Sequence, residues 1–145
     1  SAGGSPKDIN LYQAQKALDN ARQAVADGGT IILVARCAEG LGDEAFSRWV
    51  LRGDTPERMV ARIRETFELG GHKAAAIAMV RQRAEISLVS ELPPDLAAKC
   101  FMTGYPTVQD ALDRALARAG TGERAGVGAR LCIIPSGGSV LPVAG

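Results

Sequence analysis

The chain has 145 residues, 46% of them hydrophobic and 23% charged, a composition typical of one globular domain rather than of a disordered or fibrous chain. Its 17 Lys and Arg residues nearly balance its 16 Asp and Glu residues, so charge does not favour nucleic acid or an anionic membrane as a partner. No apolar run approaches the ~20 residues that span a bilayer, and no signal peptide is recognisable, so we expect a cytoplasmic protein.

The first predicted element is a helix. Ser5 at the cap, Pro6 at the first helical position and Asp8 three residues after the cap form a start signal. The helix is expected to run to about Asp27, before two glycines, with Ala14, Leu18, Ala21 and Val25 on its buried face. The following run TIILVA, residues 30–35, has no polar alternation and predicts a strand covered on both faces.

Helices and strands continue to alternate along the rest of the chain. We expect helices over 43–50, from Thr55 to the glycines at 70–71, over 72–83 and over 107–120. The second of these helices should carry Met59, Ile63 and Phe67 on one side. The last should direct four apolar residues inward: Ala111, Leu112, Ala115 and Leu116. Strands are expected over 85–90 and 129–135, with a break at Pro93 and Pro94 and a glycine loop over 135–142. This order predicts an α/β fold, a single domain with a mainly parallel sheet flanked by helices.

Glycines at positions 3 and 4 precede the first helix, as they do in many connections from a strand to a helix. The strand that such a connection requires would lie before Ser1. We therefore expect the chain to be a fragment of a longer protein.

One face of the first helix carries polar residues that could bind a ligand. Gln13 and Lys16 share a stripe with Ile9 and Asn20, opposite the apolar stripe, and Tyr12 lies beside it. A solvated helix face explains this pattern, as does a ligand site at the carboxyl edge of the sheet. In the second case Lys16 offers a positive charge and Gln13 both a donor and an acceptor.

Two further segments are candidate anion sites. SAGGSPKD, residues 1–8, is either a tight turn or a helix start whose N–H groups attract phosphate or carboxylate. The single histidine, His72, stands next to Lys73 at another predicted helix start, where the pair could recognise a carboxylate or simply cap the helix at the surface. Trp49 is expected in the core or at an interface.

The three cysteines, Cys37, Cys100 and Cys132, are far apart in the sequence. Their spacing matches neither a disulfide framework nor a zinc site, and we expect buried, reduced thiols. No metal site and no Ser-His-Asp set is predicted within the chain.

Several segments together resemble one family. SAGGSPKDINLYQAQKALDNA, GGTIILVARCAEGLG, LGGHKAAAIA, LVSELP and PSGGSVLP, in this order, are similar to the C-terminal domain of the nickel-dependent lactate racemase family. The similarity covers essentially all of residues 1–145, and the first segment is the most specific.

This resemblance implies a two-domain enzyme that racemises or epimerises a 2-hydroxy acid, lactate by default, by hydride transfer. A nickel-pincer nucleotide would be held by the N-terminal domain, which is absent here, so the fragment alone should be inactive and hold no cofactor. The C-terminal domain would close over the cleft with a Tyr-Gln-x-x-Lys segment, here Tyr12, Gln13 and Lys16. Gln13 and Lys16 would be catalytic, and Tyr12, His72 and Lys73 would bind substrate.

The residues alone leave two other hypotheses open. The chain could be a free-standing α/β module that binds a small anion or a nucleotide at residues 1–8, or an oligomerisation domain that uses Trp49 or the polar face of the first helix. The implied partners under the enzyme hypothesis are the N-terminal domain and a small 2-hydroxy acid, with no nucleic acid and no membrane.

Overall fold

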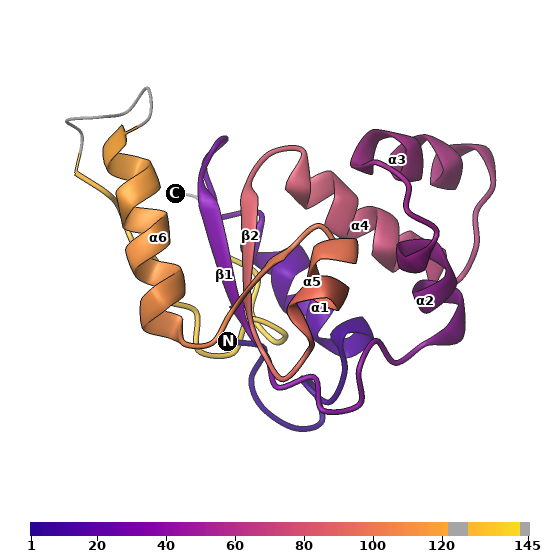
Figure 1. Cartoon of the computed structure of the whole chain (residues 1–145), viewed down its shortest axis with the longest axis horizontal. Helices are drawn as coiled ribbons and strands as arrows, with labels where there is room; N and C mark the ends of the chain where they lie inside the picture. Colours follow the sequence, from indigo (N-terminus) through magenta and orange to yellow (C-terminus); the bar gives the residue numbers. More distant parts are fainter. Residues whose placement is uncertain (122–127, 143–145) are drawn as a thin grey trace.

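The computed structural model describes residues 1–121 and 128–142 of the chain (Figure 1). Within these residues, helices and strands follow one another in the order α1 Leu11–Ala21, β1 Thr30–Val34, α2 Glu44–Leu51, α3 Pro56–Glu65, α4 Gly71–Arg81, β2 Glu85–Val89, α5 Pro94–Lys99, β3 Thr103–Tyr105 and α6 Val108–Thr121. None of the described helices is long and apolar enough to cross a membrane.

The strands form one parallel sheet in the order β1-β2-β3. Ile31 of β1 lies opposite Ile86 of β2, and Val89 of β2 lies opposite Tyr105 of β3. Each connection between strands contains at least one helix, as parallel pairing requires. The predicted fold class, a parallel sheet flanked by helices in a single domain, is confirmed.

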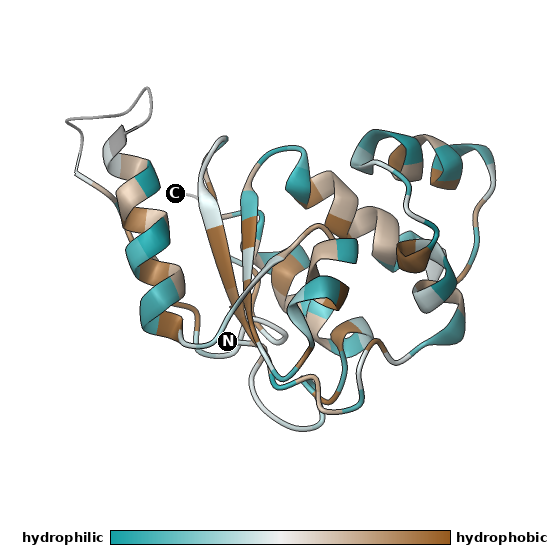
Figure 2. Ribbon diagram, viewed as in Figure 1, coloured by the Kyte–Doolittle hydropathy of each residue, from teal (hydrophilic) through white to brown (hydrophobic). Residues whose placement is uncertain are grey.

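Helices cover the sheet on both sides. Figure 1 shows α6 on one side of the strands and α1 and α4 on the other, and Figure 2 shows hydrophobic residues along β1 and β2 between them. The core between α1, α4 and the sheet contains fully buried side chains, among them Leu11, Leu18, Ile77, Ile86 and Leu88. Three alanines of α4, Ala74, Ala75 and Ala78, are also fully buried, and their small size allows α1 and α3 to pack closely against this helix.

Trp49 of α2 lies in the core, as predicted, with 5% of its surface exposed. Its indole ring covers Gly71, the first residue of α4, so closely that a Cβ atom on Gly71 would lie 2.6 Å from Nε1 of Trp49. The guanidinium of Arg62 also lies over the Trp49 ring, 4.9 Å from its centroid. The start of α4 is therefore fixed by packing that only glycine allows.

The predicted start of the first helix is wrong. Residues 4–10 form turns and bends, and α1 begins at Leu11 with Asn10 as its cap, whose Oδ1 accepts a hydrogen bond of 3.0 Å from the N–H of Gln13. The N–H groups of Leu11 and Tyr12 donate to the carbonyls of Gly40 and Leu41. These long-range bonds complete the helix start at Asn10, and the Ser5 signal is not used. The helix also ends at Ala21, earlier than expected.

The predicted third strand is also wrong. Residues 129–134 form no strand, because no described strand lies beside them to share ladder hydrogen bonds. The third strand is β3, and the short helix α5 precedes it. The prolines read as a break are the cap and first residue of α5, where a missing N–H costs nothing.

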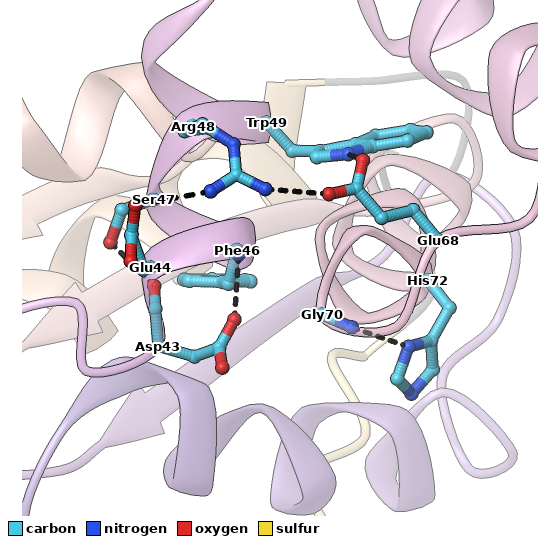
Figure 3. Close-up of polar contacts among 9 residues, drawn as sticks. All are labelled: Asp43, Glu44, Phe46, Ser47, Arg48, Trp49, Glu68, Gly70 and His72. Carbon is cyan, nitrogen blue, oxygen red and sulfur yellow. Dashed lines mark hydrogen bonds and ion pairs between the residues drawn. The ribbon is translucent and has the colours of Figure 1, made fainter.

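α3 ends at Glu65, five residues before the predicted end at the glycines. Phe67, expected on its inner side, is 71% exposed. The reason is Glu68, whose carboxylate accepts hydrogen bonds from Trp49 Nε1 at 2.6 Å and from Arg48 Nη2 at 2.7 Å (Figure 3). These bonds hold residues 66–70 as a loop across α2 instead of a continued helix. In α6, Leu116 is likewise 46% exposed instead of buried.

The prediction of buried thiols holds for two cysteines. Cys37 and Cys100 are buried, and burial raises the pKa of each thiol to about 12, so both stay protonated at neutral pH. Cys132 is exposed, because the segment that carries it lies outside the core.

We predict that Gly71→Ala destabilises the protein by about 1–3 kcal/mol, because the new methyl group overlaps the Trp49 ring. Gly120→Ala is the matched control: Gly120 also lies in a helix, α6, but a Cβ there meets nothing within 4 Å. The control should be neutral or stabilising by up to about 1 kcal/mol. Urea denaturation followed by circular dichroism measures both, and equal effects would refute the packing argument.

We also predict that Glu68→Gln weakens the dependence of stability on acid pH. The hydrogen bonds from Trp49 and then Arg48 lower the pKa of the Glu68 carboxyl. The folded state therefore holds this proton less tightly than the unfolded state, whose Glu pKa is ~4.3. The contribution of Glu68 to the free energy of unfolding is present above about pH 4.3 and is lost as the pH falls through the pKa of the folded state.

The control for this experiment is Glu65→Gln, an exposed carboxylate for which the described part of the chain provides no hydrogen bond or ion pair. The free energy of unfolding should be measured at intervals between about pH 6 and pH 3. The Glu68 variant should show the flatter profile, and identical profiles for wild type and Glu68→Gln would contradict the assignment.

Candidate functional site

The first turns of α1 and α4 lie at the same edge of the sheet. Each helix precedes a strand in the chain order, α1 before β1 and α4 before β2, and leads back to the amino end of that strand. Both helices therefore begin at the carboxyl edge of these parallel strands. Open α/β sheets bind ligands at this edge. The edge carries all of the predicted site residues: Tyr12, Gln13, Lys16, His72 and Lys73.

Lys73 joins the two helices. Its Nζ donates a hydrogen bond of 2.8 Å to the backbone carbonyl of Tyr12 and lies 3.9 Å from the centroid of the Tyr12 ring. The Tyr12 ring in turn packs edge-on against Phe46, with 5.9 Å between the ring centroids. The structure thus brings Tyr12 and Lys73 into direct contact, and the aromatic face and the carbonyl both stabilise the ammonium.

A second positive charge lies near Lys73. Burial is the largest cause that lowers the pKa of Lys73, the charge of Lys16 lowers it further, and the carboxylate of Asp43 acts in the opposite direction. Lys16 itself is exposed on α1, four residues after Tyr12. Lys16 and Lys73 therefore lie near each other, with Asp43 close to Lys73, and this pair of positive charges suits an anionic ligand.

Gln13 lies on the same exposed face of α1 as Lys16, three residues before it. In the described part of the chain, no hydrogen bond is formed by the side-chain amide of Gln13 and none by the ammonium of Lys16. Both groups are therefore available to a ligand. The other two residues of the predicted stripe differ: Ile9 precedes α1, and Asn20 is half-buried and donates a hydrogen bond of 2.7 Å to the carbonyl of Gly137.

His72 is oriented differently from the other four residues. Its Nδ1 accepts a hydrogen bond of 3.1 Å from the N–H of Gly70 (Figure 3). Its ring lies against Phe67, with the centroids 5.7 Å apart. With Nδ1 as an acceptor, the neutral ring carries its proton on Nε2. No described contact links the His72 side chain to Tyr12 or Lys73, so His72 lies in the first turn of α4 but its ring is directed to the 66–70 loop beside the site.

The sequence did not identify Asp43 as part of this site. Asp43 caps α2 by accepting a hydrogen bond of 2.8 Å from the N–H of Phe46, and its charge acts on Lys73. The pattern Gly-Asp-Glu at 42–44 was a visible helix start. Its proximity to Lys73 depends on the packing of α2 against α4, which no local signal predicts.

The suggested anion site at residues 1–8 is wrong, because no helix begins there. The segment instead holds the glycine loop near the C-terminus: Lys7 Nζ donates to Ser139 Oγ at 2.6 Å, and the N–H of Gly137 donates to the carbonyl of Ser1 at 2.8 Å. The predicted position of the 135–142 loop, at the same edge as the opening turn, is confirmed. The free-standing anion-binding hypothesis thereby loses the helix start on which it was based.

Other features of the described residues do not compete with this edge. No group of three or more His, Cys, Asp or Glu side chains in residues 1–121 and 128–142 could hold a metal ion. A hollow of about 610 Å³ lies at the opposite, amino edge of the sheet, lined by residues that include Arg81, Glu85 and Thr103. Its lining contains none of the predicted site residues.

Comparison with known proteins relates the whole described fold to one family. The family model "lactate racemase C-terminal domain" matches residues 1–142. The lactate racemase of Lactiplantibacillus plantarum is 31% identical over 144 residues, which are 96% of this chain and 32% of that protein. The lactate racemase of Thermoanaerobacterium thermosaccharolyticum is 41% identical over 63 residues, 43% of this chain and 15% of that protein.

A solved structure agrees with these similarities. The structure of the lactate racemase apoprotein from Thermoanaerobacterium thermosaccharolyticum superposes with a TM-score of 0.77 at 27% sequence identity, and the match covers 83% of this chain and 30% of that one. The chain thus spans about a third of the length of the Lactiplantibacillus plantarum racemase and of the solved racemase chain. With its parallel sheet and its family match over residues 1–142, the chain belongs to the lactate racemase C-terminal domain family.

Proposed function

We propose that the chain is the cleft-closing C-terminal domain of a cytoplasmic racemase or epimerase of 2-hydroxy acids, with lactate as the default substrate. The remaining part of the enzyme, an N-terminal domain, would hold a nickel-pincer nucleotide, and this chain would be inactive alone. The observation that carries the proposal is the pair of ammonium groups, Lys16 and Lys73, at the carboxyl edge of a domain of this family.

The side chains at this edge fit the anionic parts of such a cofactor or substrate, not its metal. Lys16, Lys73 and the amide of Gln13 are nitrogen donors suited to a carboxylate or a phosphate. Nickel ligands would therefore have to come from outside the described residues. When bound, the cofactor would supply the group that takes up and returns a hydride.

Lys16 and Gln13 would act on the substrate directly. The exposed ammonium of Lys16 would pair with the carboxylate of the 2-hydroxy acid, or stabilise charge on the oxygen at C2 while the C–H bond breaks. Gln13, one turn before Lys16, would donate to or accept from the same ligand and fix its orientation. Both roles require that the second domain covers this face and excludes water.

Tyr12, Lys73 and His72 would form the substrate-binding surroundings. Lys73 is held by Tyr12, so its charge is placed in advance and little conformational freedom is lost on binding. His72 would present Nε2–H from the first turn of α4 and contribute to the choice among 2-hydroxy acids. Asp43 would limit the total positive charge of the site.

We predict that Lys16→Ala in the complete, cofactor-loaded enzyme lowers kcat/KM for racemisation by about 10²–10³-fold, the usual effect of removing one charge-stabilising donor. Lys99→Ala is the control, since Lys99 is an exposed lysine at the last turn of α5. Loss of optical rotation across a panel of 2-hydroxy acids gives the rates. A Lys16 variant as active as the Lys99 variant would remove Lys16 from the proposed role.

We further predict that substrate affinity falls at high pH because Lys73 loses its proton. Since its pKa is lowered, the ammonium deprotonates below the ordinary lysine value of ~10.4 and the carboxylate loses a partner. Lys73→Arg keeps its charge throughout this range. The rise of KM between about pH 7 and pH 10 should therefore be smaller in Lys73→Arg than in the wild type. Superimposable KM profiles would contradict this role of Lys73.

A further inference from the structure

The outer edge of β1 has no strand beside it in the part of the chain that the structure describes. β1 pairs with β2 on one side, and the sheet order ends there. Its sequence, TIILV, contains no lysine, no proline and no other charged residue (Figure 2). Edge strands normally carry such residues to prevent pairing with other chains, so this edge has the composition of an interior strand.

A second apolar segment is directed toward the same edge. Residues 129–134, ARLCII, lead to the carboxyl end of the sheet, and two of their side chains are strongly exposed, Leu131 at 63% and Ile133 at 78%. Leu116, on the inward stripe of α6, is 46% exposed. Apolar side chains on α6 and on the 129–134 segment thus lack the cover that the rest of the core has.

The backbone of Ser1 and Ala2 lies between these two segments. The N–H of Ala2 donates a hydrogen bond of 3.0 Å to the carbonyl of Val34, at the end of β1. The amino group of Ser1 donates a hydrogen bond of 2.9 Å to the carbonyl of Ile134, and the carbonyl of Ser1 accepts a hydrogen bond from the N–H of Gly137. Consecutive residues therefore bond to opposite sides, as in a strand with a neighbour on each side.

The pattern on the Ile134 side also gives a direction. In a parallel pair, the N–H of one residue bonds to the carbonyl before its partner and its own carbonyl accepts from an N–H after that partner. Ser1 bonds to Ile134 and to Gly137 in this way, with one extra residue between them. A chain that continued backwards from Ser1 would run between β1 and residues 129–134, parallel to both.

We propose that this open edge is the seat of a further parallel β-strand, supplied by the residues of the complete enzyme that directly precede Ser1. The strand pairs with β1 on one side and with residues 129–134 on the other, which then become the outer strand of a five-stranded sheet. Its side chains are apolar on both faces, because α6 covers one face and α1 the other. The inference rests on the proposed function only in taking the chain as part of a longer enzyme.

This arrangement has a consequence for the site. The added strand leads without interruption into the turn that ends at Asn10 and into α1, which carries Gln13 and Lys16. The rest of the enzyme is then joined to the core of this domain by a strand rather than by a flexible linker. Any hinge for closure lies upstream of that strand, and the orientation of Lys16 is fixed by the sheet.

Hydrogen exchange of the full-length enzyme tests the proposal without substrate or nickel. The amides of Cys132 and Ile134 should exchange at least about 100-fold more slowly than in an unstructured peptide, and the residues just before Ser1 should be protected with them. Rapid exchange in both segments would overturn the proposal. Protection in the isolated chain that grows with concentration would assign the edge to a second copy and would also overturn it.

Proline substitutions distinguish the two sides of the outer strand. Because the carbonyl of Ile134 faces the added strand, the backbone of Cys132 faces it too and that of Ile133 faces away. At each position the Tm of the proline variant of the full-length enzyme is compared with that of the alanine variant. Cys132→Pro should have a lower Tm than Cys132→Ala, and this loss should exceed the loss of Ile133→Pro relative to Ile133→Ala by about 2 °C or more. Equal losses would contradict the pairing. If the added strand is protected but the enzyme racemises no 2-hydroxy acid, the proposed function is refuted and the added strand is not.

Discussion

The contact between Lys73 and Tyr12 is the interaction on which the candidate site depends. A half-buried ammonium is costly unless its charge is compensated, and here a carbonyl oxygen and an aromatic face provide the compensation. The contact also fixes α4 against α1 at their first turns, so the positions of Lys16 and Lys73 are determined together. Their mutual repulsion is relieved by Asp43 only in part, and an anion between them would relieve it further.

The surrounding fold is arranged to make this contact possible. Buried alanines of α4 and the absence of a side chain at Gly71 let the helices approach closely. Gly42 has a φ of 94°, and a Cβ there would lie 2.5 Å from Cγ of Asn10, the residue that caps α1. Glu68 holds the 66–70 loop across α2, which places His72 beside the site. Each of these constraints acts on the carboxyl edge of the sheet.

Local signals in the sequence were sufficient for the fold class and for most elements. The runs predicted at 30–35 and 85–90 contain the strands Thr30–Val34 and Glu85–Val89. The helix starts at Thr55 and Thr107 and the exposed positions of Gln13 and Lys16 follow from capping and periodicity. Predictions failed where distant groups decide the structure. Asn10 replaced Ser5 as the cap because the carbonyls of Gly40 and Leu41 accept from the N–H groups of the first turn, and Phe67 is exposed because Glu68 bonds to Trp49. Contact between Tyr12 and Lys73 is likewise tertiary, and the family resemblance, not periodicity, placed both in one site.

We infer that Lys16 and Lys73 form one anion-binding face directed toward the rest of the enzyme. A crystal structure of the full-length enzyme with a 2-hydroxy acid bound tests it most directly. The substrate carboxylate or C2 oxygen should lie within about 3 Å of Lys16 Nζ, with Lys73 still held by the Tyr12 carbonyl. A substrate bound away from α1, or a Lys16 side chain directed into solvent in the closed enzyme, would contradict it.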